Sequence, residues 1–447
     1  MMETRPMEPV AAARSRRGGR RRMLPAALAL LALAWLAAPH AGARQGARGA
    51  PLAGPSEQGA PGRVLAERAH RAMQRAVSWL LARQHDNGSF GAIPGASEQG
   101  ELGITALVVR ALAGLPAPLR TEAVARARER ATAWLLAQQR PDGSFGQPGT
   151  GLVTYRTAIA IDALVALDAA RHAEAIRRAR DYLVATQFHT AEVLGPNPED
   201  SPYYGGWGYD RSGVRPEADL SNTAMALDAL RRAGLPEDSP VWQRALVFLR
   251  RCQNHSETND LKSDEVVIGQ DGGFMYDPGL ERRMSVPVPR PDGRVEIPSY
   301  ASMTYAGLLS MLHARLRRDD PRVQAAWGWI RRNYTLEENR GLGTHEDRSR
   351  GQQGLYYYYL MFAKALAAWG EPVIETADGQ RRHWAQDLVE RLLALQREDG
   401  SWYNDEPRWW ERDPVLVTAY VLQALEIALP WLERGAGEPG AGGGAER

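Results

Sequence analysis

Hydrophobic positions recur along this chain in pairs of helical segments. The first segment of each pair is amphipathic and ends at or near a glutamine, as in LLARQ (residues 80–84) and LLAQQ (residues 135–139). A short turn with glycine and an aromatic residue follows, and then a second segment that is apolar on all sides. Helices that are apolar all round are buried, whereas amphipathic helices cover a surface. The pattern therefore predicts alternating outer and inner helices.

Six such pairs can be recognised between residues 63 and 433. The fifth outer segment is a weaker copy that ends at Tyr334, and the other five end at Gln84, Gln139, Gln187, Gln253 and Gln396. Repeats that cannot bury their apolar faces alone stack on their neighbours. We predict an all-α fold, an (α/α)6 toroid of six inner and six outer helices, because closure of the array removes both exposed ends.

The turn within each pair has a readable physical role. Asp-Gly and Gly-Gly pairs permit the left-handed backbone that ends one helix and reverses direction. We expect the glutamine amide, which both donates and accepts, to satisfy backbone groups at the helix ends. We expect the turn aromatics to dock between neighbouring pairs; they are Phe90, Phe145, Trp207, Phe274 and Trp402.

The two ends of the chain lie outside this repeat. A basic run, the apolar stretch from Met23 to Ala38 and small residues up to Ala43 have the order of a secretory signal. Residues 1–43 are thus predicted to be a signal peptide that exports the protein to the periplasm or the extracellular space, with an N-terminal membrane anchor as the alternative. Residues 44–62 and 434–447, rich in Gly, Pro and Ala, are predicted to be a flexible linker and a disordered tail.

Charge and cysteine content exclude some partners. The predicted signal carries seven arginines and two glutamates, so its removal changes the formal net charge from +2 to −3. Because binding of phosphates needs a concentrated basic face, nucleic acid is not expected as a partner. Cys252 is the single cysteine, so no internal disulfide can form. Its position just before Gln253 favours a buried, inert thiol.

The repeated sequence pattern resembles that of a known protein family. Segments such as FLRRCQ followed by GGF, LLALQREDGSW and LLAQQRPDGSF are similar to the repeats of squalene-hopene cyclases and, more broadly, of the prenyltransferase and squalene-cyclase superfamily. The resemblance covers about residues 64–433. It implies an α/α toroid with a hydrophobic central cavity, and this chain has room for one of the two barrels of a full triterpene cyclase.

The same resemblance shows which catalytic groups are missing. Class II cyclases protonate an alkene with an Asp in a D-x-D-D-T-A motif, a step that requires an unusually strong acid. In the matching stretch, Asp219 keeps the first position, but Ser221 replaces the proton donor and Asn222 replaces the last Asp. The stretches that begin at Ile297 and Leu416 lack the Asp, Cys and His that hold zinc in prenyltransferases. We therefore predict that cyclase activity is lost and that the protein uses no metal or cofactor.

Several polar residues remain near the predicted mouth of the toroid. The candidate catalytic carboxylates are Glu101, Asp210, Asp219 and Asp277. An Asp three residues after the turn aromatic recurs at Asp210, Asp277 and Asp405, and this repetition favours helix capping or loop ties. Carboxylates that converge from different turns could instead form an acid/base pair.

Other residues are candidates for the cavity wall. Successive positions of a helix fan around its axis, so at most two of the tyrosines 356–359, such as Tyr356 and Tyr359, can face a cavity together. Aromatic faces suit a cationic or polyprenyl ligand, whereas core packing is the alternative for these tyrosines. The full set of candidates is Trp207, Ser221, Asn222, Tyr300, Tyr356 and Tyr359.

The leading hypothesis is an exported toroid that binds an apolar or isoprenoid-like ligand, or that acts as an interaction scaffold for a membrane surface or a protein. The alternative is an enzyme that uses carboxylates at the mouth, either terpene cyclase- or isomerase-like or glycan-cleaving, the last with paired carboxylates in an open cleft. The polar, proline-rich insertion at residues 281–297 is expected to form a lid or a partner-binding loop. The sequence gives no indication of oligomeric state.

Overall fold

Outer and inner helices alternate along the chain. The computed structural model describes residues 59–92, 100–146, 151–210, 217–279 and 284–432. The outer helices in these ranges are α1 (Gly59–Leu81), α3 (Glu122–Ala137), α5 (Ala173–Thr186), α8 (Pro240–Cys252), α10 (Pro321–Arg332) and α12 (Trp384–Ala394). The inner helices are α2 (Leu102–Ala113), α4 (Val153–Asp168), α7 (Leu220–Arg232), α9 (Ala301–His313), α11 (Leu355–Trp369) and α13 (Pro414–Leu432).

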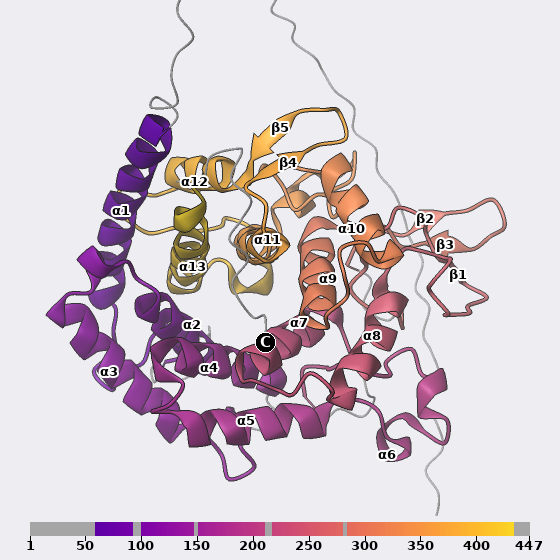
Figure 1. Cartoon of the computed structure of the whole chain (residues 1–447), viewed down its shortest axis with the longest axis horizontal. Helices are drawn as coiled ribbons and strands as arrows, with labels where there is room; N and C mark the ends of the chain where they lie inside the picture. Colours follow the sequence, from indigo (N-terminus) through magenta and orange to yellow (C-terminus); the bar gives the residue numbers. More distant parts are fainter. Residues whose placement is uncertain (1–58, 93–99, 147–150, 211–216, 280–283, 433–447) are drawn as a thin grey trace, which may run out of the picture. The chain divides into compact units, whose positions relative to one another are not determined.

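The inner helices form a closed circuit. Each packs against the next, from α2 through α4, α7, α9, α11 and α13, and α13 packs in turn against α2. The outer helices surround them, and α1 contacts both α3 and α12, so the outer layer also continues past the point where the chain starts and ends (Figure 1). The predicted (α/α)6 toroid is confirmed within the described part of the chain.

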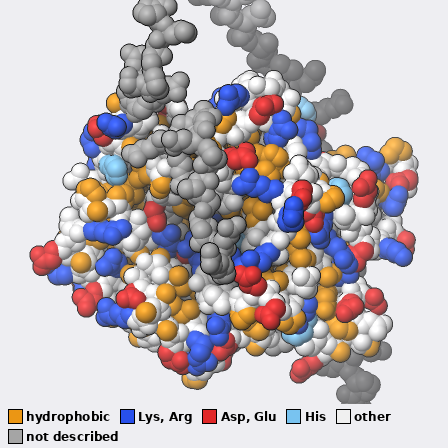
Figure 2. Space-filling model, viewed as in Figure 1, with side chains coloured by type: hydrophobic (Ala, Val, Ile, Leu, Met, Phe, Trp, Pro, Cys, Tyr) orange, Lys and Arg blue, Asp and Glu red, His pale blue; other side chains and the backbone are white. Residues whose placement is uncertain are grey.

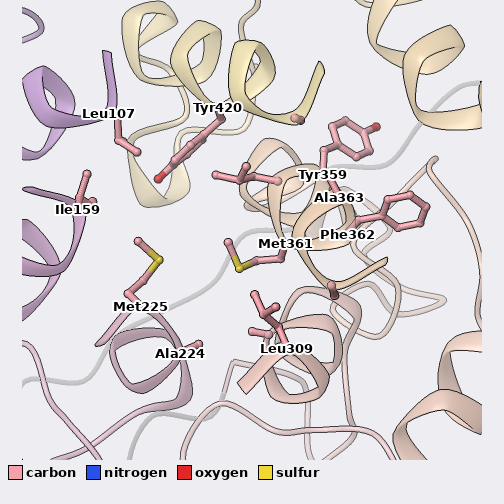
Figure 3. Packing of buried hydrophobic residues seen from close by; sticks show 14 of the residues in the cluster. Leu107, Ile159, Ala224, Met225, Leu309, Tyr359, Met361, Phe362, Ala363 and Tyr420 are labelled. Carbon is pink, nitrogen blue, oxygen red and sulfur yellow. The ribbon is translucent and has the colours of Figure 1, made fainter. Parts of the chain in front are cut away.

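Apolar side chains of the inner helices fill the middle of the ring. Figure 3 shows Leu107, Ile159, Met225, Met361 and Tyr420 pointing from five different helices toward one central space. Helix α13 is long and apolar enough to span a membrane, but most of it is buried inside the protein. Its composition therefore follows from its place in the inner ring.

Glutamine amides join the outer helices in series. The Nε2 of each glutamine donates to the glycine carbonyl of its own turn and to a carbonyl of the next outer helix. Gln396, after the last outer helix, lies 2.9 Å from the Gly400 carbonyl and 2.9 Å from the Ala72 carbonyl in α1, so the series closes on itself. In the weaker fifth copy, the Tyr334 hydroxyl donates to Asp387 of α12 instead. The expected role of the amide is confirmed.

The turn aromatics dock as expected. All five are fully buried. The backbone N–H of each donates to a threonine hydroxyl on the following inner helix, in the pairs Phe90–Thr105, Phe145–Thr157, Trp207–Thr223, Phe274–Thr304 and Trp402–Thr418. These bonds fix the angle between the outer and the inner helix of a pair.

Short strands and short helices lie in the segments that connect the ring helices. Strands β1 (Val266–Val267), β3 (Val295–Glu296) and β2 (Val288–Pro289) form a small sheet in that order, and β4 (Val373–Glu375) pairs with β5 (Arg381–His383). The short helices are α6 (Ala191–Leu194), η1 (Ala117–Leu119), η2 (Pro198–Asp200), η3 (Ser349–Gln352) and η4 (Arg408–Trp410). The described part of the 281–297 insertion thus supplies two strands to a sheet, and Ile297 packs with Val266 and Met275.

The predicted ends of the toroid can be compared only in part. Helix α1 begins at Gly59, inside the stretch 44–62 that the sequence assigns to a linker. The predicted signal and tail, and most of the predicted linker, lie outside the described residues.

A buried cluster of charged side chains occupies the C-terminal ends of the inner helices. Lys364 Nζ lies 2.7 Å from a carboxylate oxygen of Asp228 and 3.5 Å from one of Asp162. Arg110 lies 3.3 Å from Asp162 and 2.7 Å from Glu426. Each inner helix contributes to the cluster, whose members are Arg110, Asp162, Asp228, Arg232, His313, Lys364 and Glu426.

The charges in this cluster depend on one another. Burial alone would raise the pKa of the Asp162 and Asp228 carboxyls, but the attraction of Lys364 and Arg232 outweighs it and holds each pKa below its usual 3.8. Both carboxylates are therefore ionised at neutral pH. The cluster closes one end of the ring interior with salt bridges rather than with apolar packing.

We predict that Gln139→Ala lowers the free energy of unfolding by about 1–3 kcal/mol, because the Gly143 and Ala175 carbonyls lose their donor. Urea denaturation measures this difference. The neighbouring Gln138→Ala is the matched control, since its amide makes only a 3.4 Å contact within its own helix. Equal losses of unfolding free energy for the two substitutions would contradict the role of the Gln139 amide in joining its turn to α5.

We predict that Lys364→Met lowers the free energy of unfolding at pH 7 by about 3–5 kcal/mol, because Asp162 and Asp228 remain buried without their cation. Lys262→Met is the control, since the only other lysine of the chain is exposed. The depressed carboxylate pKa values stabilise the fold above pH 3.8, and this contribution is lost as pH falls through the lower folded values. The difference between wild type and Lys364→Met should therefore narrow in acid, and a constant difference would argue against the assigned pairing.

Candidate functional site

A cavity of about 340 Å³ lies between the N-terminal ends of the inner helices. Every inner helix or the residue that caps it contributes to the wall, for example through Glu101, Tyr155, Ser221, Ser302, Tyr357 and Leu416. The volume falls within the range of roughly 300–1,000 Å³ typical of small-molecule pockets. None of the described residues of the 281–297 insertion lies in this wall, and its expected role as a lid or a partner-binding loop stays a prediction.

Aromatic side chains dominate the wall. They are Tyr155, Tyr209, Tyr276, Tyr300, Tyr357, Trp409, Trp410 and Tyr420. Hydroxyls pair with one another, with 2.9 Å between Tyr155 and Ser221 and 2.8 Å between Tyr209 and Tyr276. Burial raises the pKa of Tyr155 and Tyr276 well above 10, so both remain neutral. The wall thus offers ring faces and aliphatic carbon, with paired hydroxyls.

Glu101 is the one candidate carboxylate in the wall among those that the sequence analysis proposed. It caps helix α2, and its Oε2 accepts from the Ile104 N–H at 2.6 Å. Its Oε1 lies 2.8 Å from Arg156 Nε, which also lines the cavity. Glu101 therefore enters the site as half of a buried ion pair.

Asp219 and Ser221 occupy the stretch that resembles the cyclase acid motif. Asp219 is fully buried and caps helix α7, with 2.8 Å to the Asn222 N–H and 2.9 Å to the Asn222 side-chain amide. Neither Asp219 nor Asn222 lines the cavity, which differs from the expectation for Asn222. Ser221 does line it, and its hydroxyl lies 3.2 Å from that of Tyr357.

The remaining carboxylates lie in loops away from the cavity wall. Asp277 accepts from the Gly279 N–H at 2.6 Å, as expected for a loop tie. Asp210 is half-buried and Asp405 is exposed. The wall does not include any of these three. A catalytic role for Asp210, Asp219 or Asp277 stays a prediction.

The expected set of cavity residues needs correction in α11 and at the turn. Tyr300 lines the cavity as expected, but Tyr356, Tyr359 and Trp207 do not. Figure 3 shows Tyr359 pointing away from the centre, and its hydroxyl donates to the Leu336 carbonyl at 2.6 Å. One residue advances a helix by about 100°, so the inward position is Tyr357. Trp207 serves as a docked turn aromatic, with its ring N–H donating to the Leu183 carbonyl.

Glu411 is the site residue that sequence reasoning missed. One of its carboxylate oxygens accepts from the Tyr356 and Tyr357 N–H groups at 3.0 and 2.8 Å, and the other from Asn404 at 2.6 Å. It thereby caps helix α11 from a distant loop. Burial raises the pKa of the Glu411 carboxyl to about 7, although these hydrogen bonds favour the charged form.

The loop that delivers Glu411 is strained. Trp409 and Trp410 have φ values of 56° and 63°, a region that non-glycine residues rarely adopt. Such conformations persist where the surroundings hold them, and they cluster at functional sites. Gly354 also has a positive φ, and a Cβ there would lie 2.8 Å from the Trp409 ring. The packing of this ring against Gly354 fixes the loop beside the cavity.

A reactive thiol and a metal centre are the other kinds of chemical site that the residue types could form. Cys252 is buried, and burial raises the pKa of its thiol well above 9, so the expected inert thiol is confirmed. A search of the described residues finds no group of three or more His, Cys, Asp or Glu side chains that could hold a metal ion. On the face shown in Figure 2, basic and acidic side chains are interspersed over the described surface.

The closed ring of inner helices and its apolar cavity define a helical-repeat (α/α)6 toroid. Residues 63–265 match the family model of the squalene-hopene cyclase C-terminal domain. This match covers less than half of the chain and makes that part similar to the cyclase domain. A search of curated proteins finds no match.

Solved structures share the fold at low sequence identity. Cellobiose 2-epimerase from Spirochaeta thermophila has 15% identity and a TM-score of 0.51, covering 84% of this chain and 99% of its own. An α-1,6-mannanase of Salegentibacter has 10% identity and a TM-score of 0.50, covering 83% of this chain and 100% of its own. The type II terpene cyclase MstE from Scytonema has 17% identity and a TM-score of 0.49, covering 83% of this chain and 99% of its own.

We predict that Glu411→Gln removes a pH-dependent loss of stability. The folded pKa of about 7 lies above the ordinary 4.5, so the contribution of Glu411 to stability is fully present below pH 4.5 and is lost as pH rises through 7. From pH 4.5 to pH 8, Glu411→Gln should gain up to about 3 kcal/mol relative to wild type. Urea denaturation across this range measures it, with the exposed Asp405→Asn as control. Parallel pH profiles of wild type and Glu411→Gln would contradict the raised pKa.

Proposed function

We propose that this protein binds a hydrophobic, isoprenoid-like molecule in its central cavity and does not cyclise it. The observation that supports this most directly is the aromatic and aliphatic wall of a 340 Å³ cavity inside a closed helical ring. Burial of apolar ligand surface against such a wall supplies binding free energy of about 25 cal/mol per Å². The cavity is roughly twice as large as an engineered cavity of about 150 Å³ that binds benzene.

The residue types around Ser221 support the loss of cyclase chemistry. An alkene accepts a proton only from an acid much stronger than a hydroxyl. Ser221, which occupies the place of the proton donor by resemblance, shares hydrogen bonds with Tyr155 and Tyr357. Both carboxylate oxygens of Glu411 accept hydrogen bonds, one from the Tyr356 and Tyr357 N–H groups and the other from Asn404. The wall can therefore enclose an alkene without attacking it.

A glycan-cleaving activity receives less support. Sugar hydrolysis uses two carboxyl groups on either side of the scissile bond. Within the described wall, Glu101 is held by Arg156 and Glu411 by the start of α11. The many apolar contacts of this cavity suit hydrocarbon better than hydroxyl-rich ligands. Export through residues 1–43 is part of the proposal and rests on the sequence pattern alone.

We predict that the purified full chain binds farnesol or geranylgeraniol at one molecule per chain, as detected by native mass spectrometry. Ile159→Trp should weaken this binding at least about tenfold, because Ile159 lines the cavity and the larger ring fills it. Val64→Trp is the control, since Val64 is exposed on α1. Leu107→Phe is a milder second filling variant, and circular dichroism establishes that each variant is folded.

Two results would contradict this function. Absence of bound isoprenoid, or binding that the filling variants do not change, would remove the assignment of a ligand to this cavity. Cyclised product after incubation with squalene or a shorter polyprenoid, measured by gas chromatography and mass spectrometry, would show that an acid other than the expected motif is active.

A further inference from the structure

The charges around the central cavity do not balance. Among the described residues, three charged side chains line it, namely Glu101, Arg156 and Glu411. Glu101 and Arg156 neutralise each other at 2.8 Å. Among the described residues, Glu411 has hydrogen bonds from backbone N–H groups and from Asn404 but no basic side chain in a salt bridge. When Glu411 is ionised, the cavity wall carries one uncompensated negative charge.

Four aromatic side chains line the same cavity as this charge. Tyr357 and Tyr420 stand edge to face with centroids 6.2 Å apart, and Trp409 and Trp410 precede Glu411 directly in the chain. All four line the cavity. Besides burial, the charge of Glu411 is the largest cause that raises the pKa of Tyr420, which places the two groups close together. Ring faces attract a cation, and the attraction grows when water is excluded.

We propose that the ligand of this cavity carries a cationic ammonium head that lies against Glu411, with its apolar chain between the tyrosines. This inference rests on the proposed function and adds the chemical class of the ligand. A buried carboxylate without a cation is costly, and a neutral ligand would leave Glu411 in that state or force it to take up a proton. An ammonium group between ring faces supplies the missing charge.

The positive ends of the inner helices do not already supply it. Helix N-termini carry partial positive charge, and two of those around the cavity have their own carboxylate caps, Glu101 on α2 and Asp219 on α7, whereas α4 and α9 have no side-chain cap. Glu411 satisfies N–H groups at the start of α11. These N–H groups carry only partial charge, so a full positive charge from the ligand still improves the balance.

The test compares two ligands that differ only in charge. One is a farnesyl chain with a trimethylammonium head, which is cationic at every pH, and the other is its uncharged isostere with carbon in place of nitrogen. Affinities are measured at pH 8 by tryptophan fluorescence, below the concentrations at which the chains aggregate. We expect wild type to bind the cation about tenfold more tightly than the isostere.

Substitution of Glu411 assigns the effect to this side chain. Glu411→Gln keeps the shape and an acceptor for the Tyr356 and Tyr357 N–H groups, so it should bind the isostere within about threefold of wild type but lose most of the preference for the cation. Asp405→Asn removes an exposed acid of the same loop and should keep the preference. Circular dichroism and the retained affinity for the isostere show that Glu411→Gln is folded.

The outcomes separate this inference from the proposed function. Equal affinity of wild type for both ligands, or an undiminished preference in Glu411→Gln, overturns the cationic ligand and leaves a neutral isoprenoid as the occupant. Failure of wild type to bind either ligand overturns both proposals.

Discussion

The contact between α13 and α2 is the constraint on which the rest of this structure depends. The inner helices are apolar on nearly every side, so an open array would expose one such helix at each end. Closure buries both, and the Gln396 amide joins the last outer helix to Ala72 in the first. The cavity and the charged cluster exist only once the ring is closed, because each takes residues from helices that are distant in the chain. Glu426 meets Arg110 only across the closure.

Buried charged groups are neutralised in different ways at the two ends of the ring interior. At the N-terminal ends, Glu101 and Asp219 cap their helices and Glu411 caps α11, so acidic groups meet the positive ends of helix dipoles. At the C-terminal ends, Arg110, Arg232 and Lys364 neutralise buried carboxylates and meet the negative ends of the dipoles. The second end needs no ligand for charge balance. The N-terminal end contains the cavity, together with one carboxylate that has no basic partner among the described residues. The proposals therefore concern this end.

Sequence reasoning reached the features that repeat and missed those that depend on closure. Paired helices, stapling amides and docked aromatics were predictable because each lies within one repeat and recurs. The charged cluster also left a sequence signal, since four of its members, Arg110, Asp162, Asp228 and Lys364, directly precede a pair of residues Ala-Leu. Single charges on apolar helices do not reveal that they share a face of one ring. Glu411 had no such signal, because its meeting with the start of α11 is set by tertiary packing. The sequence pattern leaves the rotational phase of α11 open by one residue. It therefore could not decide whether Tyr356 or Tyr357 faces the cavity.

The groups that stabilise the fold lie apart from the cavity wall. The glutamine amides and the turn aromatics act on the outer layer, and the charged cluster holds the far end of the interior. None of these groups lines the cavity. The hydroxyl of Ser221, which the resemblance places at the position of the cyclase acid, concerns only the wall, where it bonds with Tyr155 and Tyr357. Glu411 is a wall residue that also supports a helix start, because one carboxylate oxygen accepts from the Tyr356 and Tyr357 N–H groups and the other from Asn404. These contacts come from neutral donors, so the full charge of the carboxylate has no basic partner among the described residues, and this is the physical reason to assign that charge to a ligand.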